Sequence, residues 1–408
     1  MMKEVSLQEC LIDVIDNRGV TPHKRGTEWK DFGIPVYSAN NIKTSGIQRK
    51  EEIRYIDEKI YDSWMKIPLE KGDILLTSEA PAGEVFYWDS NDKIIVGQRL
   101  YGLKVKKEIN SKYLKYYLQS SIGQKAILSQ QSGSTVSGIS AKTFTNIKIH
   151  LPEKNKQDDI GEFLYILDKK NETNNKINLE LESMVKTIYD YWFLQFEFPN
   201  EDGKPYKSSG GKMVWSKELK REIPEGWEVK KLKDIVYLGN DKKYEGPNVN
   251  TIDLSVMPSS SISLNEINES KNFDTNLYEM KKYDILFGSI RAYLKKAGIA
   301  PCDGAVTGTV YSFRCFNKND YNFALETLCS DNMFNYACKN SKGSKMPVIG
   351  SDRILEYPIA YNNNITKRFN DISVKEMIAS NVMENQELAS LRDFLLPLLM
   401  NGQVVIED

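Results

Sequence analysis

Residues 71–76 have the sequence Lys-Gly-Asp-Ile-Leu-Leu, and residues 282–287 have the sequence Lys-Tyr-Asp-Ile-Leu-Phe. The offset between the two segments is 211, and Ser78 matches Ser289 at the same offset. Each segment is a short apolar run that follows a turn-forming aspartate, which is typical of a buried strand. The chain therefore repeats a strand-like segment after about half of its length.

Weaker matches occur in the same order along the chain. At offset 210, residues 100–104 match 310–314, Gly133-Ser134 matches Gly343-Ser344, and Ile139 matches Ile349. At offset 207, residues 178–183 match residues 385–390. Because the order is shared and the offset is nearly constant, the sequence predicts a duplicated unit of roughly 200 residues, far longer than a solenoid repeat.

Each unit is predicted to contain a mixed globular part followed by a long helix. In the first copy, strands are expected near residues 74–77 and 94–105, and a helix near residues 111–130. A heptad seam then follows at Ile160, Leu164, Leu167, Asn171, Asn174, Asn178, Leu181, Val185, Ile188 and Trp192. The second copy has a similar seam that ends near Pro397, a residue expected to bend or end the helix.

Asparagines interrupt the middle of both seams, namely Asn171, Asn174, Asn178, Asn381 and Asn385. Buried asparagines lower stability but define the register of a coiled coil, so we expect these residues to meet in an antiparallel helix pair. A helix of about 37 residues is about 55 Å long, and DNA half-sites lie about 34 Å apart. Alternatively, each helix packs on its own globular part.

We therefore predict an α+β fold in which two mixed α/β domains are joined by two long antiparallel coiled-coil helices, with a pseudo-twofold internal duplication. The expected boundaries are 1–153 for the first globular domain, 154–196 for the first helix, 197–226 for a connector, 227–362 for the second domain, 363–402 for the second helix and 403–408 for a tail. The connector is rich in Pro, Gly, Ser and Lys.

Composition excludes several classes of protein. The 408 residues are 40% hydrophobic and 27% charged, with a net charge of -1, which indicates a globular chain and not a disordered one. Two histidines and five cysteines without a C-x-x-C pair make a metal site an unfavourable interpretation. Neither a signal peptide nor a membrane-length apolar run is visible, so we expect a cytoplasmic protein without a membrane partner.

The whole chain, from about residue 5 to 402, resembles the specificity subunits of type I restriction-modification systems. The lobe pattern is residues 71–75 with Gly97-Gln98-Arg99-Leu100. The most specific stretches are Tyr-Trp-Phe at 191–193, Gly-Lys-Pro-Tyr-Lys-Ser-Ser-Gly-Gly at 203–211, Ile-Pro-Glu-Gly-Trp at 223–227 and Leu-Leu-Pro-Leu-Leu-Met-Asn-Gly at 395–402.

The resemblance implies a non-catalytic subunit with two target recognition domains. Each domain would recognise one half of a bipartite, asymmetric sequence in double-stranded DNA, and the helices would set the spacer. The subunit would dock two methyltransferase subunits and further restriction subunits. S-adenosylmethionine and ATP with Mg²⁺ are expected in those partners, and no cofactor is expected in this chain. The second lobe has Thr307-Gly308-Thr309 where the first has Gly97-Gln98-Arg99.

Polar loops provide the candidate DNA contacts, because bases and phosphates are bound by amides, hydroxyls and cations. In the first lobe the candidates are Ser38, Asn40, Asn41, Lys43, Ser78, Gln98, Arg99, Ser134 and Thr135. In the second lobe they are Ser289, Arg291, Ser344 and Lys345. The alternatives are an Asx-turn at 38–43, strand-end hydrogen bonds at Ser78, a surface ion pair at Arg99 and a flexible turn at 132–135.

Two other functions were weighed. An independent methyltransferase or nuclease is disfavoured, because the chain contains no Pro-Pro, no phosphate-binding G-x-x-x-x-G-K-[ST] loop and only a common Glu-x-Lys at 228–230. The other alternative, a coiled-coil protein-binding scaffold without DNA recognition, is left open by the residues alone. Steeply salt-dependent retention on heparin would argue against this scaffold.

Overall fold

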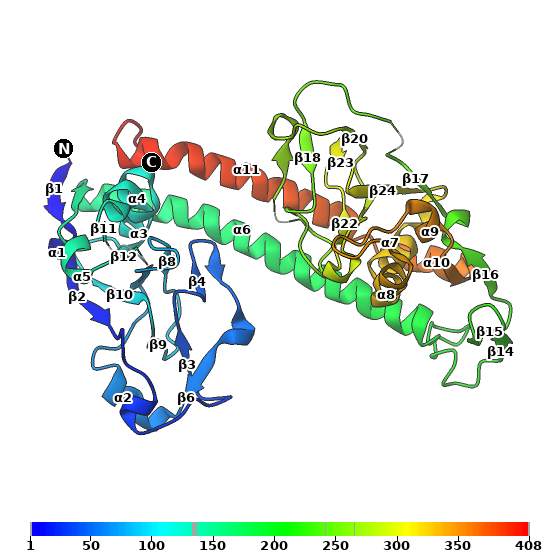
Figure 1. The fold of residues 1–408 in the computed structure, drawn as a ribbon, viewed down its shortest axis with the longest axis horizontal. Coiled ribbons are helices and arrows are strands. Elements are labelled where there is room, and N and C mark those ends of the chain that lie inside the picture. The colour runs from blue at the N-terminus through cyan, green and yellow to red at the C-terminus, as the bar shows by residue number, and fades with distance from the viewer. Residues whose placement is uncertain (1, 133–136, 241, 265, 407–408) are drawn as a thin grey trace. The chain divides into compact units, whose positions relative to one another are not determined.

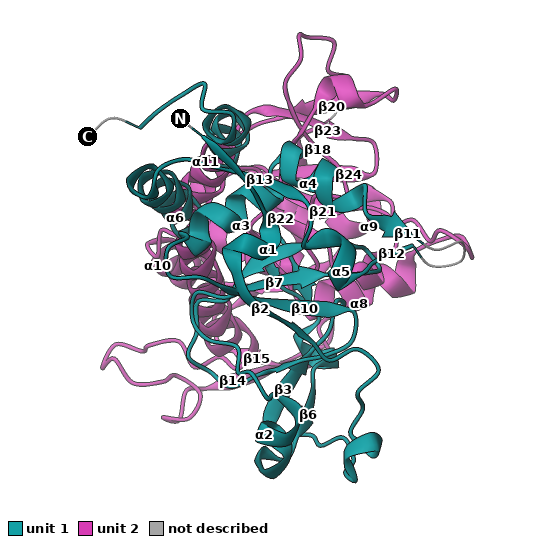
Figure 2. Cartoon of the chain, turned by 90° about the vertical axis from the view of Figure 1, so that its left-hand side faces the viewer, with its two compact units in different colours: residues 1–169, 389–408 teal, residues 170–388 magenta. Residues whose placement is uncertain are grey.

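The computed structural model describes residues 2–132, 137–240, 242–264 and 266–406. Its contacts divide the chain into two compact units, coloured separately in Figure 2: unit 1 contains residues 1–169 and 389–408, and unit 2 contains residues 170–388. Two long helices, α6 (Lys154–Tyr189) and α11 (Lys375–Met400), contribute residues to both units (Figure 1). The sequence had assigned each long helix to a segment of its own.

Unit 1 is built on an antiparallel sheet with the strand order β2-β10-β7-β8, formed by Leu11–Asp16, Leu100–Val105, Ile74–Thr77 and Val85–Tyr87. A second sheet has the order β6-β3-β9, formed by Arg54–Ile56, Ile34–Tyr37 and Ile95–Val96. In this sheet β3 and β9 are parallel. Helices α3 (Ser111–Gln119) and α4 (Ser121–Leu128) replace the single helix expected over 111–130, because Ser120 ends one and caps the other.

Unit 2 repeats this plan. Its first sheet has the order β17-β24-β21-β22, formed by Val236–Leu238, Val310–Cys315, Ile285–Gly288 and Ala297–Ile299. Its second sheet has the order β19-β18-β23-β20, formed by Asn268–Glu269, Asn250–Ile252, Gly304–Thr307 and Leu277–Met280. Here β18 and β23 are the parallel pair. Helices α7 (Tyr321–Cys329) and α8 (Asp331–Asn340) correspond to α3 and α4, so the predicted duplication is confirmed.

The remaining elements are short apart from α10. In unit 1 they are β1 (Lys3–Ser6), α1 (Leu7–Cys10), β4 (Ile42–Lys43), β5 (Gly46–Ile47), α2 (Tyr61–Trp64), β11 (Gln131–Ser132), β12 (Gly138–Ile139), α5 (Ala141–Phe144) and β13 (Lys148–Leu151). In unit 2 they are β14 (Met213–Ser216), β15 (Arg221–Pro224), β16 (Glu228–Lys231), α9 (Ser351–Leu355), β25 (Pro358–Tyr361) and α10 (Asn363–Asn370). Among the described residues, no helix is both long and apolar enough to cross a membrane.

The aspartate of the repeated strand motif holds the same position in both units. Asp73 lies 3.0 Å from Lys104 Nζ, and Asp284 lies 2.7 Å from Arg314 Nε on the equivalent strand. The side chains of both aspartates and of Lys104 are at most 10% exposed, and that of Arg314 is 19% exposed. A buried carboxylate needs such a partner to offset its lost hydration. The repeated Asp therefore anchors the start of one strand to its neighbour, which explains the shared sequence.

Aromatic side chains fill both cores. In unit 1, Tyr113, Tyr116 and Tyr117 of α3 are fully buried and pack with β7 and β10. In unit 2, the cluster around Phe193 and Phe323 includes the seam residue Val185 of α6 and also Tyr189, which lies off the seam at the end of that helix. Burying one such side chain contributes about 1.5–3 kcal/mol, so the helix ends are held by the globular parts and not only by each other.

The structure differs from the long helices that the sequence predicts. The expected helix over 154–196 ends at Tyr189 and continues as a π-helical turn, Asp190–Leu194. The expected helix over 363–402 consists of α10 and α11, separated by residues 371–374. The buried Asn322 amide donates to the carbonyls of Phe369 (3.1 Å) and Ile372 (2.7 Å) and so stabilises this break. Pro397 lies within the last turn of α11.

Candidate nucleic-acid interface

Three segments of unit 1 meet at the end of strand β7. The Ser78 amide donates to the Arg99 carbonyl (2.9 Å), and the Ile139 amide donates to the Ser78 carbonyl (3.0 Å). The Tyr101 hydroxyl, which is buried, donates to the Ile139 carbonyl (2.8 Å). Residues 78–80, 97–99 and 138–139 are thereby joined, and with the adjacent loop 38–43 they form what we call loop edge 1.

Unit 2 contains the same arrangement. The Ser289 amide donates to the Thr309 carbonyl (2.9 Å), and the Ile349 amide donates to the Ser289 carbonyl (2.9 Å). The Tyr311 hydroxyl donates to the Ile349 carbonyl (3.1 Å). Residues 289–292, 308–309 and 342–349 form loop edge 2. Because each contact has its counterpart in unit 1, the duplication extends to individual main-chain hydrogen bonds.

The two serines at these edges are not available to a ligand. Ser78 is fully buried, and Ser289 is 3% exposed, with its hydroxyl donating to the Thr309 carbonyl at 2.9 Å. The prediction that Ser78 and Ser289 contact DNA therefore finds no support in their positions, because neither hydroxyl is exposed. A small side chain is needed where three segments converge, and this packing explains why serine recurs at the position.

Gln98 also has a structural role that its sequence context did not reveal. Its Oε1 accepts from the Gly19 amide (3.0 Å), and its Nε2 donates to the Val20 carbonyl (2.7 Å). Gln98 therefore holds the 19–20 loop, although one N–H and one lone pair of its exposed amide remain free. The predicted base contact from Gln98 stays a prediction, beside this positioning role.

Arg99 is the exposed cation of loop edge 1. Its backbone is left-handed (φ 58°), and its Nε lies 3.3 Å from Glu79 Oε2. An exposed ion pair of this kind contributes only about 0–1 kcal/mol, so it exchanges readily for a phosphate or a base. A left-handed backbone in a non-glycine residue is costly and is often found at functional sites.

In the loop 38–43, some residues form a local turn and others remain candidates for DNA contact. Asn41 is buried, and its Oδ1 accepts from the amide (3.0 Å) and hydroxyl (2.9 Å) of Ser38, three residues earlier. This contact closes a local turn but is not an Asx-turn, in which the oxygen accepts from the amide two residues later. Lys43 pairs with Glu84 at 3.4 Å. Asn40 is exposed, so Asn40 and Lys43 remain candidates, whereas Ser38 and Asn41 are reassigned to the turn.

Loop edge 2 presents its cations on different segments. Arg291 is exposed and left-handed (φ 50°), and its amide donates to the Pro347 carbonyl (2.8 Å). This bond places it beside the loop that carries the exposed residues Ser344 and Lys345. Three predicted residues therefore lie together. Lys342 is a further exposed cation on the same loop that was not predicted, although it directly precedes the Gly343-Ser344 repeat match.

Two of the predicted contacts, Ser134 and Thr135, lie outside the described residues. The remaining candidates can be compared between the two edges. Ala80 and Arg291 are equivalent and both left-handed (φ 55° and 50°), so the same backbone turn presents a methyl group in unit 1 and a guanidinium in unit 2. Arg99 is equivalent to Thr309. The main-chain arrangement is thus shared while the exposed chemistry differs.

The asparagines of the two seams meet within unit 2. Asn174 Nδ2 donates to Asn385 Oδ1 (3.0 Å), Asn381 Nδ2 donates to Asn178 Oδ1 (2.8 Å), and Asn171 Nδ2 donates to the Asn385 carbonyl (3.3 Å). The pairing order shows that α6 and α11 are antiparallel here, as expected. Asn175, which lies off the seam and was not predicted, accepts from Asn385 Nδ2 (2.8 Å).

A second cluster joins the same helices within unit 1. Asp168 of α6 accepts from Lys115 Nζ (2.6 Å), the Tyr116 hydroxyl (2.6 Å) and Arg392 Nη1 of α11 (3.0 Å). Burial by itself would raise the pKa of Asp168, but these three donors hold it below the ordinary value. Periodicity could not reveal this cluster, because Asp168 stands beside the seam and its partners are distant in sequence.

Among residues 2–132, 137–240, 242–264 and 266–406, no group of three or more His, Cys, Asp or Glu residues is arranged to hold a metal ion. The exposed chemistry of both loop edges is instead that of cations, amides and hydroxyls. These groups bind phosphates and base edges in protein–DNA complexes.

Comparison with known proteins is consistent with this chemistry. A family model described as "Type I restriction modification DNA specificity domain" matches residues 3–183. The MjaIX type I restriction enzyme specificity subunit of Methanocaldococcus jannaschii is 27% identical over 96% of this chain and 91% of its own length. The HindI specificity subunit of Haemophilus influenzae is 20% identical over 83% of this chain and 88% of its own length.

A solved structure supports the fold. The type I restriction-modification S subunit from M. genitalium superposes with a TM-score of 0.58 at 15% identity, and the match covers 98% of this chain and 96% of that chain. At this level of identity the likeness concerns the fold alone.

Proposed function

Because this chain belongs to the specificity subunits of type I restriction-modification systems, we propose that loop edges 1 and 2 each recognise one half of a bipartite, asymmetric DNA target. The subunit is non-catalytic and supplies sequence recognition to its complex. The comparisons do not favour a scaffold without DNA recognition.

The observation that carries the proposal is the shared main-chain arrangement with different exposed side chains. Unit 1 places Arg99 before β10, where unit 2 has Thr309, and unit 2 places Arg291 after β21, where unit 1 has Ala80. A guanidinium can donate two hydrogen bonds to a guanine edge or to a phosphate. Threonine offers only one hydroxyl, and alanine offers no hydrogen-bonding side chain. Two edges of this kind would recognise different half-sites while approaching DNA with the same backbone.

We further propose that α6 and α11 set the spacer between the half-sites. The asparagine contacts support this role, because a polar pair inside a helix seam disfavours sliding of one helix along the other. A helix of 36 residues, the length of α6, spans about 54 Å, which is sufficient for a spacer of about one DNA turn.

The partners and compartment follow from the family and are part of the proposal. We propose that the chain docks two methyltransferase subunits, with restriction subunits completing the complex in the cytoplasm. S-adenosylmethionine would bind the methyltransferase subunits, and ATP with Mg²⁺ would bind the restriction subunits. The absence of any phosphate-binding G-x-x-x-x-G-K-[ST] motif from this sequence supports that division of labour.

Mapping of modified adenines across a host genome tests the proposal. The host would carry the cognate methyltransferase subunit with or without this chain. One split motif should gain methylation only when the chain is present. Replacing residues 1–153 with the corresponding region of another specificity subunit should change only one half of that motif. Unchanged methylation, with the two proteins still co-purifying, would contradict the proposal and favour the scaffold.

A further inference from the structure

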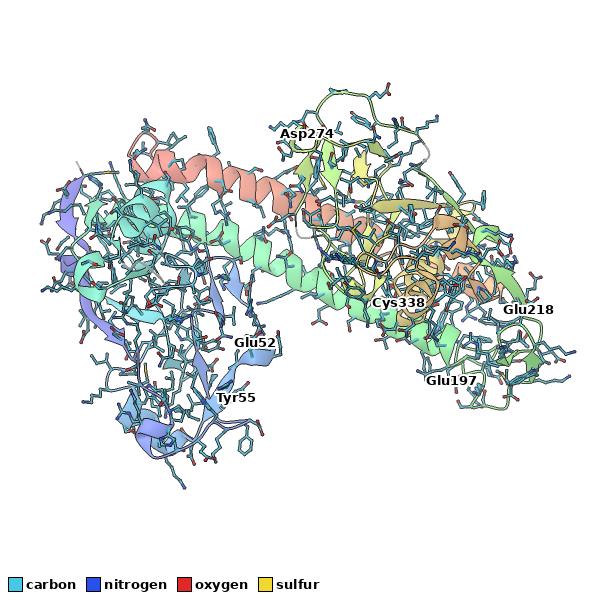
Figure 3. The ribbon with its side chains drawn as sticks, in the orientation of Figure 1. Glu52, Tyr55, Glu197, Glu218, Asp274 and Cys338 are labelled. Atoms are coloured by element: carbon cyan, nitrogen blue, oxygen red, sulfur yellow. The ribbon has the colours of Figure 1, made fainter. Side chains whose placement is uncertain are left out.

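A cavity of about 260 Å³ lies inside unit 2, away from loop edge 2. It is lined by the end of α6, the β14–β15 hairpin, the start of α8 and strand β25. Its polar lining comes from Glu218, Arg221, Ser330, Asn332 and Tyr357. Figure 3 labels Glu218, which belongs to the β14–β15 hairpin.

Arg221 is a half-buried cation without a counter-charge. Its guanidinium carbon lies 4.8 Å from the centre of the Phe196 ring, and its side chain makes no ion pair or hydrogen bond with any residue that the structure describes. The other half-buried arginines behave differently, since Arg314 pairs with Asp284 and Arg392 pairs with Asp168. Burial lowers the pKa of Arg221, because no carboxylate offsets the lost hydration.

Two further donors line the same cavity. The Tyr357 hydroxyl and the Asn332 amide form no side-chain hydrogen bond with another described residue. Together with the planar guanidinium fork they match the needs of a carboxylate, which accepts two parallel bonds from arginine. Glu218 at the rim would repel a dianion such as phosphate more strongly than a single carboxylate.

The cavity is distinct from the DNA-facing loops of the same unit. Helix α8 begins at Asp331, beside the cavity, and ends at Asn340, just before the loop that carries Lys345. Its 10 residues span about 15 Å, which separates the cavity from that loop along the helix axis. With a volume of about 260 Å³ and mostly apolar residues beside Arg221, the cavity suits a single protein side chain.

We propose that this cavity binds an aspartate or glutamate side chain of a methyltransferase subunit, with Arg221 as the bidentate donor and Tyr357 and Asn332 as flanking donors. The identity of that partner rests on the proposed function. The carboxylate chemistry rests only on the unpaired guanidinium, its two neighbouring donors and the shape of the cavity.

The first experiment measures binding of the cognate methyltransferase subunit to the full chain by isothermal titration. Arg221→Met retains the length and the packing on Phe196 but removes the fork. We expect it to weaken binding at least tenfold, because an interfacial carboxylate would be left unpaired. Arg368→Met is the matched control, since Arg368 also lies near an aromatic ring, Trp192, but is exposed and donates to the Pro199 carbonyl. Equal affinity of wild type and Arg221→Met, or equal weakening by both variants, would overturn the proposal.

The second experiment separates the cavity from the identity of the partner. Thermal unfolding of the isolated chain is compared in sodium acetate, phosphate and chloride at equal ionic strength. Acetate should raise the Tm of wild type and of Arg368→Met but not of Arg221→Met, because an anion that binds only the folded state stabilises it. Stronger Arg221-dependent stabilisation by phosphate, or none by acetate, would overturn a carboxylate site. Failure of the wild-type chain to bind the methyltransferase subunit would instead count against the proposed function.

Discussion

Asn174 of α6 donates a 3.0 Å hydrogen bond to the side-chain oxygen of Asn385 on α11, and Asn174 is 1% exposed. Near it, Asn178 Nδ2 is buried and has no hydrogen-bond partner among the described residues. The polar layer is thus only partly satisfied, which makes it more costly than an apolar seam. Its physical benefit is a defined register between the two helices.

Replacing both members of the Asn178–Asn381 pair should separate stability from register. We expect Asn381→Leu alone to destabilise the chain by about 1–3 kcal/mol, because Asn178 would lose its remaining side-chain partner. The double variant Asn178→Leu with Asn381→Leu should recover stability to at least the wild-type value. Urea unfolding measures both effects, and equal destabilisation by the single and double variants would contradict the argument. In adenine mapping, the double variant should methylate sites with more than one spacer length.

Arg291 should contribute to recognition of one half-site only. We expect Arg291→Met to weaken binding of the complex to its target by about 1–3 kcal/mol if Arg291 contacts a base. If Arg291 contacts a phosphate, the loss of affinity should be the same for all DNA sequences. The slope of log affinity against log salt concentration should then decrease in magnitude by about one. Arg353→Met, at an exposed arginine of α9, is the control and should leave binding unchanged. DNA titrations at several salt concentrations distinguish these outcomes, and wild-type affinity in Arg291→Met would exclude the contact.

Glu326 should make the chain less stable as pH rises. Burial raises the pKa of Glu326 to about 8, with Lys186 and Glu182 of α6 and Asp190 of the following π-helical turn as the neighbouring charges. Below the ordinary pKa of 4.5 the group is protonated in both the folded and unfolded states, and its cost is absent. Above pH 4.5 the cost of ionising the buried carboxyl grows with pH, and it is complete above about pH 8. Glu326→Gln should therefore be on the order of 2–4 kcal/mol more stable than wild type at pH 9 and equal to it near pH 4. Thermal unfolding across this range measures the difference, and a difference that does not change with pH would contradict the assignment.

Asp168 should be important for stability, whereas its neighbour Asp393 should not. Asp168→Asn leaves Lys115 and Arg392 without their shared carboxylate, and we expect a loss of about 3–5 kcal/mol, as for other broken buried pairs. Asp393 also pairs with Arg392, at 2.8 Å, but is 66% exposed. Asp393→Asn should therefore cost about 0–1 kcal/mol. Denaturant unfolding of the two variants provides the comparison, and similar losses in both would show that Asp168 is not the centre of the cluster.

Parts of the candidate site could be predicted from residue type and repeat position. Arg291, Ser344 and Lys345 were each predicted as DNA contacts, and the structure joins their segments through the Arg291–Pro347 contact. The structural roles of Ser78 and Gln98 could not be predicted, because residues that hold a loop in place and residues that bind a ligand can be of the same polar type. Only the contacts with Ile139 and with Gly19 show that these side chains have a structural role.

The sequence by itself determined the duplication, the repeated Asp-anchored strand and the two asparagine-interrupted seams, because these features are encoded in local periodicity and in a constant offset. The tertiary structure alone decided which polar groups are exposed. It also created the Asp168–Arg392 cluster and the cavity with an unpaired Arg221. These features depend on contacts between residues far apart in the chain. The same charged group contributes little to the free energy of unfolding when it is exposed and several kcal/mol, about 3–5, when a buried pair is broken.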